Sequence, residues 1–308
     1  MMISRDLKET IKRIVSGSVL FDEPMNRHTS MGVGGTADIF MSPVTIEELQ
    51  TTVSCLSDEK VPFVPVGNCT NLIVRDGGYR GALISLKGLE TVEVSKEEGD
   101  SVFLSAQTGA HLSRLVELSV RKSLTGMEFC AGIPGSVGGG VKMNAGAYGK
   151  ELKDVVEFVS LITREGIIID VARDDLRFEY RNFVLAEGTV IVSAVFGLRK
   201  GSQTNIRERI SYIMNMRKKK HPLAYRSAGS VFKNPPDEPA GRIIDEVGLK
   251  GLRIGDAMVS KIHGNFIVNL GKATAKDITL LMDTVQNKVL EERGILLEPE
   301  IKIIGDEL

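Results

Sequence analysis

A glycine-rich stretch from Gly126 to Gly149 constrains this chain more than any other part of its sequence. Eight of these 24 residues are glycine, and neither lysine nor arginine occurs in the stretch before Lys142. Glycine lets main-chain N–H groups turn and approach a ligand closely, which is how proteins hold phosphate without side chains. Ile133 and Val137 interrupt the glycines and Pro134 stiffens them, so we predict an ordered binding loop rather than a flexible linker. A diphosphate is the first ligand to consider.

Length, composition and charge describe an ordinary globular protein. A chain of 308 residues exceeds the usual size of one hydrophobic core, so we expect two or three domains. Hydrophobic residues make up 42% of the chain and charged residues 26%, which is typical of soluble proteins. The net charge of -1 predicts no general affinity for nucleic acid or for an anionic membrane.

The sequence predicts a cytoplasmic protein. No apolar run reaches the length of a membrane span, and residues 1–16 lack the apolar centre of a signal peptide. Because no partner motif is visible, we expect a monomer. The cysteines form no CxxC pair and are too scattered for a disulfide framework or a zinc site, so we expect them to be reduced: Cys55, Cys69 and Cys130. The histidines do not cluster in the sequence, so no metal site is predicted: His28, His111, His221 and His263.

Hydrophobic periodicity predicts a mixed helix and strand fold without the regular alternation of a doubly wound protein. Helices are expected through residues 7–15, after Thr45, around 112–116, through 206–214 and after Thr274. Thr45 with Glu48, and Thr274 with Asp277, form capping patterns. Strands are predicted at 37–41, 61–66, 82–86, 91–95, 101–106, 155–162, 167–171, 189–198, 266–270 and 300–304. A domain boundary is predicted at 200–202 and a loop at 226–236.

No familiar nucleotide-binding motif fits the glycine-rich segments. The sequence has no Walker loop, no GxGxxG after a strand and no HExxH. Three glycine-rich turns, at 29–35, 67–71 and 132–140, are more than one phosphate needs, and they suggest an extended ligand such as a dinucleotide. The turn at 67–71 follows a predicted strand, where an α/β sheet places its ligands.

Motifs along nearly the whole chain, from about Phe21 to Gly305, resemble those of UDP-N-acetylenolpyruvoylglucosamine reductases and occur in that family's order. They are GNCTNL at 67–72, GIPGSVGG at 132–139, MNAGAYG at 143–149, YR at 180–181, SAGSVFKNP at 227–235 and EPE at 298–300. Without a tyrosine-rich insertion near its C-terminus, the chain resembles the family's shorter form.

The resemblance implies an α+β fold in which FAD lies between two subdomains of the vanillyl-alcohol-oxidase type. A C-terminal α/β domain would bind the UDP-sugar. We therefore predict an N-terminal helix at 1–17, an FAD-binding domain at 18–200 that divides near residue 86, and a substrate domain at 201–308. The residues implied to surround FAD are Thr29, Gly67, Asn68, Cys69, Thr70, Asn71, Gly132, Ser136, Gly138, Gly139 and Ile191.

The resemblance also implies a reaction in peptidoglycan precursor synthesis. In this family NADPH reduces the flavin, and a hydride then passes to C3 of the enolpyruvyl group, which leaves negative charge at C2 next to the carboxylate. By likeness, Arg181 grips that carboxylate, Ser230 donates the proton to C2 and Glu300 polarises the same centre. Lys220 and Asn234 match residues that hold the UDP part of the substrate.

The chain departs from the family's pattern at two positions. Cys69 stands where the family usually has glycine, which we expect to cost little if the residue has negative φ. Phe183 stands where the family usually has serine, so the serine's contact with Arg181 is either missing or supplied elsewhere. Two other functions stay open: a flavin oxidase of the same fold that acts on an alcohol or hydroxy acid, and a non-catalytic nucleotide-binding protein.

Overall fold

The computed structural model describes residues 3–308, in which the chain forms two compact units. Unit 1 consists of the described part of Met1–Phe21 together with Ile39–Asn68 and Gly81–Asn215. Unit 2 consists of Asp22–Asp38, Cys69–Arg80 and Met216–Leu308. Each unit therefore combines segments that are far apart in the sequence.

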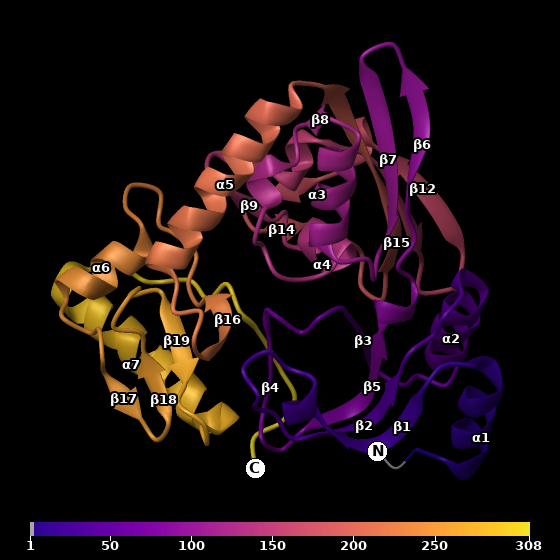
Figure 1. Ribbon diagram of the computed structural model, residues 1–308. Helices are drawn as coiled ribbons and strands as arrows, with labels where there is room; N and C mark the ends of the chain where they lie inside the picture. Colours follow the sequence, from indigo (N-terminus) through magenta and orange to yellow (C-terminus); the bar gives the residue numbers. More distant parts are fainter. Residues whose placement is uncertain (1–2) are drawn as a thin grey trace. The chain divides into compact units, whose positions relative to one another are not determined.

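The N-terminal part of the chain forms a four-stranded sheet and two helices (Figure 1). The strand order is β1 (Val19–Pro24), β2 (Thr36–Met41), β5 (Tyr79–Ser85) and β3 (Phe63–Val66). The helices are α1 (Arg5–Ile14) and α2 (Ile46–Asp58), and Thr45 caps α2 by accepting a hydrogen bond from the Glu48 N–H at 3.1 Å. Leu7 and Leu49 of these helices are buried in one core with Ile39 and Ile84 of the strands.

An antiparallel sheet forms the centre of unit 1 (Figure 1). Its order is β12 (Ile168–Ala172), β11 (Val156–Ile162), β15 (Val190–Lys200), β7 (Ser101–Gln107) and β6 (Val92–Glu98), and β8 (Leu124–Thr125) also pairs with β15. Two helices pack on this sheet, α3 (Leu112–Arg121) and α4 (Val137–Lys142). Leu115 and Val141 of these helices share a core with Leu104 and Phe196 of the strands.

Short elements connect these parts. Two hairpins pair β9 (Gly146–Ala147) with β10 (Lys150–Glu151), and β13 (Phe178–Glu179) with β14 (Asn182–Phe183). The 3₁₀ helices are η1 (Met25–Arg27), η2 (Leu86–Gly88), η3 (Glu128–Cys130), η4 (Leu152–Asp154) and η5 (Arg173–Asp175). The long helix α5 (Gln203–Lys220) has its first thirteen residues in unit 1 and its last five in unit 2.

Unit 2 contains an antiparallel sheet and two helices. The strand order is β16 (Arg226–Ser230), β19 (Phe266–Asn269), β18 (Ala257–Val259) and β17 (Arg253–Ile254), and β20 (Lys302–Ile304) pairs in parallel with β4 (Leu72–Val74). The helices are α6 (Ala240–Glu246) and α7 (Ala275–Arg293). Thr274 and Asp277 form the predicted capping box of α7, and Gly294, at φ +67°, ends the helix.

The predicted α+β fold is confirmed, and the predicted helices and strands are present with ends shifted by a few residues. Several short elements, among them β1, α6, β17 and β18, were not predicted, and two segments predicted as loops contain regular structure. The loop expected at 226–236 begins with strand β16, which was missed because Ser227, Gly229 and Ser230 give no hydrophobic alternation. The glycine-rich loop contains helix α4, although glycine is a poor helix former.

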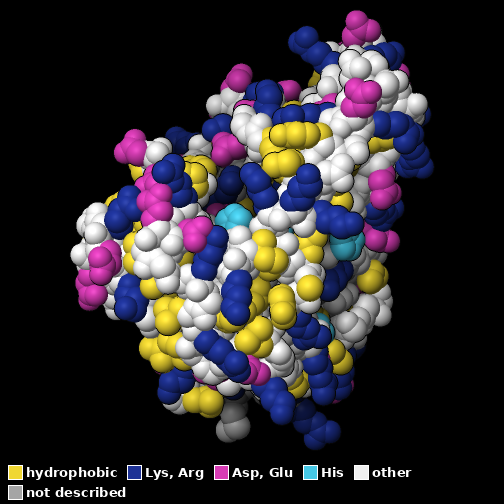
Figure 2. Space-filling model, turned by 60° about the vertical axis from the view of Figure 1, so that its left-hand side comes forward, with side chains coloured by type: hydrophobic (Ala, Val, Ile, Leu, Met, Phe, Trp, Pro, Cys, Tyr) yellow, Lys and Arg dark blue, Asp and Glu magenta, His cyan; other side chains and the backbone are white. Residues whose placement is uncertain are grey.

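Two surface properties can be compared with the composition. Among residues 3–308, no helix is long and apolar enough to cross a membrane. On the face shown in Figure 2, Lys and Arg side chains are more prominent than Asp and Glu among small hydrophobic patches, although the whole chain has 39 basic and 40 acidic residues.

Candidate active site

Two of the predicted cofactor turns lie against each other in unit 1. A Cβ added to Gly67 would lie 2.2 Å from Oγ of Ser136, so only glycine fits at position 67 while Ser136 keeps its place. The side-chain amide nitrogen of the next residue, Asn68, lies 3.3 Å from the ring nitrogens of His111. The fold therefore brings residues 67–68 next to the loop at 132–140.

Helix α4 begins inside the predicted binding loop, and its position depends on glycine. Ser136 caps the helix, because its hydroxyl oxygen accepts a hydrogen bond from the Gly139 N–H at 3.3 Å. A Cβ added to Gly138 would lie only 1.9 Å from Oγ1 of Thr108, so this glycine lets the helix rest directly on Thr108. The N–H of Thr108 donates to the carbonyl of Val192, the residue that follows Ile191, at 2.8 Å, so Thr108 contacts both α4 and strand β15.

Two buried polar atoms in this part of unit 1 have no hydrogen-bond partner among the described residues. They are Oδ1 of Asn68 and Oγ1 of Thr108. A buried polar atom without a partner costs about 1–3 kcal/mol. Gly132, with φ +72°, begins the loop at 132–140. These atoms therefore mark a place where a polar ligand would complete the hydrogen bonding.

Arg181 is held in a defined orientation in unit 1. It is the second residue of the two-residue turn between β13 and β14, and its φ is +58°. Its guanidinium donates to the carbonyl oxygen of Gly146 at 3.2 Å and lies 3.7 Å from a carboxylate oxygen of Glu151. It also lies over the ring of Tyr180, 4.9 Å from the ring centroid. These contacts are more specific than those of a surface ion pair.

Phe183, at the family's serine position, does not contact Arg181 through a hydroxyl, because it has none. Its side chain is buried in the core of unit 1 and stacks on Phe178, with 4.6 Å between the ring centroids. The contacts of Arg181 with Gly146 and Glu151 do not involve Phe183.

The third predicted cofactor turn, at 29–35, lies in unit 2 together with the second half of the 67–71 turn. The N–H of Ser30 donates to the carbonyl of Cys69 at 3.2 Å, and the hydroxyl of Ser30 donates to the carbonyl of Ser227 at 2.8 Å. Thr29 is buried and its hydroxyl donates to the carbonyl of Val33 at 2.6 Å, which closes the turn. Ser30 thus joins two cofactor turns to strand β16.

Cys69 corrects one expectation. Its φ is +51°, in the left-handed region, so the condition under which cysteine would cost little there is not met. The side chain is 6% exposed. The next residue, Thr70, is half-buried. A position that suits glycine is therefore filled by a buried cysteine.

The backbone segments that carry Ser230 and Glu300 are neighbours in unit 2. Ser230 ends strand β16 after a bulge in its pairing with β19. The N–H of Glu300 donates to the carbonyl of Val231, the residue after Ser230, at 2.8 Å. The side-chain amide of Asn71 donates to the carbonyl of Glu300 at 3.0 Å. Three separate motifs therefore meet here.

The predicted substrate residues Lys220 and Asn234 are exposed in unit 2. Lys220 is the last residue of α5. The side-chain oxygen of Asn234 accepts a hydrogen bond from the N–H of Ala240 at 3.0 Å, so Asn234 also fixes the start of α6.

Two histidines that are separate in the sequence lie together in unit 2. The ring centroids of His221 and His263 are 5.9 Å apart, and both rings contact Phe266. Burial, followed by the charge of Arg217, lowers the pKa of His221 to about 4. The expectation that the histidines do not cluster is therefore wrong for this pair, because the segment after α5 folds back onto the turn before β19.

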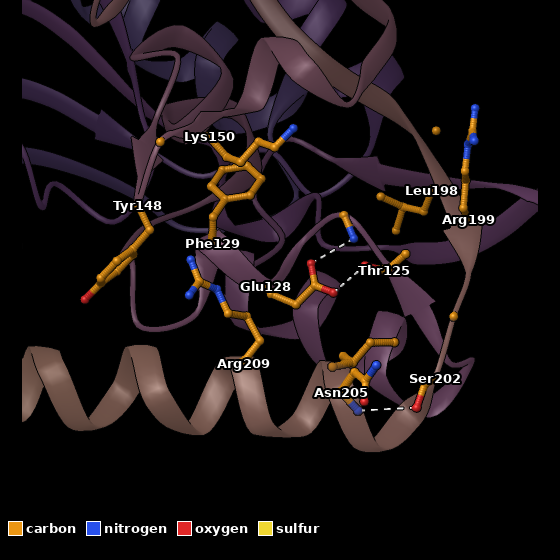
Figure 3. A pocket seen from close by; sticks show the side chains of 15 residues that line it. Thr125, Glu128, Phe129, Tyr148, Lys150, Leu198, Arg199, Ser202, Asn205 and Arg209 are labelled. Carbon is orange, nitrogen blue, oxygen red and sulfur yellow. Dashed lines mark hydrogen bonds between the residues drawn. The ribbon is translucent and has the colours of Figure 1, made fainter.

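A cavity of about 760 Å³ in unit 1 lies between α5 and the loops above it (Figure 3). At its centre the carboxylate of Glu128 accepts hydrogen bonds from the hydroxyl of Thr125 and the N–H of Gly126. Arg209 extends from α5 toward Phe129. None of the 15 residues that line this cavity is a predicted site residue, so the cavity is separate from the candidate active site.

Sequence reasoning missed several residues that shape the site. Thr108 and His111 lie in a turn that follows strand β7, just as the turn at 67–71 follows strand β3. Their position after a strand could have identified them as candidate site residues. Asn144 lies within the MNAGAYG motif but had no role assigned, and Glu151 gave no signal because its contact with Arg181 is not local in sequence.

Comparison with known proteins identifies the class of this chain. Residues 37–172 match the family described as FAD binding domain, and residues 221–304 match UDP-N-acetylenolpyruvoylglucosamine reductase, C-terminal domain. The mixed fold and the first match define an FAD-binding protein.

The chain belongs to the UDP-N-acetylenolpyruvoylglucosamine reductase family. A protein of that name from Syntrophus aciditrophicus is 48% identical over 98% of this chain and 96% of its own length. Another, from Caldanaerobacter subterraneus, is 42% identical over 97% of each. The crystal structure of the reductase from Thermus caldophilus matches with a TM-score of 0.79 and 35% identity, over 93% of this chain and 98% of that one. The predicted family is thereby confirmed.

One side chain of unit 1 has the chemistry to meet an FAD diphosphate. Because Gly67 and Gly138 have no side chains, the backbone there packs directly against Ser136 and Thr108. The hydroxyl of Thr108, which has no partner among the described residues, can donate to a phosphate oxygen, whereas Oδ1 of Asn68 can only accept a hydrogen bond.

Proposed function

We propose that this chain reduces UDP-N-acetylenolpyruvoylglucosamine to UDP-N-acetylmuramate in peptidoglycan precursor synthesis, with FAD as cofactor and NADPH as co-substrate. The proposal is supported by relatives of that name that align over almost the whole chain. It is also supported by the presence of Arg181, Ser230 and Glu300 at the matching positions.

The turns at 29–35, 67–71 and 132–139 would hold the FAD, with Ile191 beside them. Bound FAD would supply the means to accept a hydride from NADPH and pass it to C3 of the substrate. The chain would bind the FAD diphosphate through the hydroxyl of Thr108 and through main-chain N–H groups outside the first turn of α4, because the N–H groups of that turn are paired within unit 1. The capping contact of Ser136 keeps the loop in the required shape.

Ser230 would supply the proton that C2 of the substrate receives. A serine hydroxyl is a very weak acid, so it serves as a donor only to a strongly basic carbon in a site without water. Ser230 is half-buried, and its neighbour Val231 is tied to Glu300. Glu300 would then polarise the centre to which Ser230 donates.

Arg181 would bind the carboxylate of the enolpyruvyl group. Its fixed fork of N–H donors suits a carboxylate, and its positive charge stabilises the negative charge that develops next to it. Lys220 and Asn234 would contact the diphosphate of the UDP moiety. Both side chains are exposed, which leaves them accessible to a substrate.

One observation carries this proposal: in unit 2, direct hydrogen bonds connect strand β16, which ends at Ser230, and the backbone at Glu300 to the turns at 29–35 and 67–71. Ser30 bonds to both Cys69 and Ser227, and Asn71 bonds to Glu300. A protein that had lost catalysis would have no need to keep a serine and a glutamate in this arrangement.

Turnover of NADPH with the enolpyruvyl sugar tests the proposal. NADPH alone should reduce the bound FAD of the purified protein once, and continuous oxidation of NADPH should require the sugar. Ser230→Ala should keep the reduction of its flavin by NADPH but lose turnover, whereas Ser227→Ala on the same strand should keep both, because Ser227 contributes its carbonyl to Ser30. Bound flavin that NADPH does not bleach, or a parent protein that ignores the sugar, would refute the assignment.

A further inference from the structure

Arg181 occupies a backbone conformation that its surroundings must enforce. A non-glycine residue at φ +58° carries a conformational cost, and such residues persist only where neighbouring structure determines them. The hairpin that carries Arg181 has only two residues in each strand, too few to be stable alone. Other residues must therefore hold it in place.

Lys142 and Asn144 hold both strands of this hairpin from the end of α4. The ammonium group of Lys142 donates to the side-chain oxygen of Asn182 at 3.0 Å and to the carbonyl of Phe183 at 2.6 Å. The side-chain amide of Asn144 donates to the carbonyl of Glu179 on the opposite strand at 3.0 Å. The turn between the strands is thus fixed from both sides.

Asn144 also orients the carboxylate that faces Arg181. Asn144 is fully buried, and its amide nitrogen donates to Oε2 of Glu151 at 3.0 Å, while Lys153 contacts the same oxygen at 2.8 Å. The other oxygen of Glu151, Oε1, is the one that lies 3.7 Å from Nη1 of Arg181. One buried amide therefore connects the hairpin backbone to the guanidinium's acidic neighbour.

We propose that Asn144 and Glu151 position the guanidinium of Arg181 for the carboxylate of the substrate. Phe183 cannot help to position it through a hydrogen bond, because its side chain has no hydroxyl. Glu151 and the Gly146 carbonyl occupy Nη1 and Nη2. Because the donors of arginine form a rigid plane, fixing these two nitrogens fixes the direction of the remaining N–H groups. This inference rests on the proposed function of Arg181.

Binding of two UDP-sugars, measured by calorimetry on the FAD-loaded protein, separates positioning from structural support. UDP-N-acetylglucosamine lacks the enolpyruvyl carboxylate, so its affinity does not depend on Arg181. Glu151→Gln keeps the size of the side chain but removes its charge, and Asn144→Ala removes the amide that orients the carboxylate of Glu151. Each should weaken binding of the enolpyruvyl sugar about ten-fold, the order expected when a charge-assisted hydrogen bond is misaligned. Binding of UDP-N-acetylglucosamine should stay within about two-fold.

A matched control is Glu157→Gln, which removes an acidic partner of Arg173 at 2.8 Å in the same unit and should change neither affinity. If Glu151→Gln weakens both sugars equally, or neither, while the parent prefers the enolpyruvyl sugar, the positioning role is refuted and the proposed function stands. If the parent shows no such preference, the assigned role of Arg181 fails, and the positioning role fails with it.

Discussion

Replacing Cys69 by glycine and by alanine should measure the cost of its backbone conformation. Cys69 has φ +51° and is 6% exposed. An L-residue in the left-handed region costs roughly 1–2 kcal/mol, a cost that glycine avoids. Glycine also has more conformational entropy than alanine in the unfolded chain, which lowers the stability of the folded protein by roughly 0.5–1 kcal/mol. Both variants lose the same thiol, so Cys69→Gly should be more stable than Cys69→Ala by about 0.5–1 kcal/mol.

Cys130 provides the matched control for this comparison. The side chain of Cys130 is 1% exposed, and its φ is not positive. Glycine gains nothing from its conformational freedom there. Cys130→Gly should therefore be less stable than Cys130→Ala by about 0.5–1 kcal/mol, the opposite sign to the pair at position 69.

Thermal unfolding of the four variants, followed by circular dichroism with FAD present and absent, measures both differences. A chain of this size shifts its midpoint by about 2 °C for each kcal/mol. Opposite signs at the two positions would support the argument. If glycine is less stable than alanine at position 69 by as much as at position 130, the left-handed conformation carries no cost and the reasoning is wrong.

Three further predictions concern packing, capping and pH. Gly138→Ala should lower the FAD content of the purified protein, because the new Cβ would lie 1.9 Å from Oγ1 of Thr108. Gly139→Ala should not lower it, because the nearest contact of its Cβ is at 3.4 Å. The absorbance of bound flavin measures the FAD content of both variants. Asp76→Ala should cost about 1–2 kcal/mol in urea unfolding, because that carboxylate accepts hydrogen bonds from the first two N–H groups of α7 at 3.0 and 2.8 Å; an unchanged midpoint would contradict this. Burial lowers the pKa of His221 from 6.5 to about 4, so the unfolded chain binds the proton more readily and the stability of the protein falls as the pH drops from 6.5 to about 4. In melting curves recorded across these pH values, His221→Gln should lose less stability than the parent protein. An equal loss of stability in both proteins would contradict this prediction.

The sequence predicted features that depend on neighbouring residues. Thr274 and Asp277 cap α7 as expected because both partners lie within one helical turn of each other. The strand at 190–200 was equally visible, since its β-branched residues are buried on the sheet. The site motifs were also recognisable by type and order. Which of them bind FAD or substrate stays a prediction that the experiments above address.

The remaining features depend on contacts between distant segments, and for that reason periodicity could not show them. Helix α4 has three consecutive glycines, yet it forms because the carbonyls of Ala110 and Thr108 accept hydrogen bonds from its first two N–H groups at 2.8 Å each. The same absence of side chains that weakens the helix lets it approach Thr108. The absence of a side chain therefore lowers the helix propensity of these residues and also allows the backbone to approach closely. At this binding loop, the close approach outweighs the low helix propensity. Where glycines cluster after a strand, a short helix held by tertiary contacts is as consistent with the sequence as a loop.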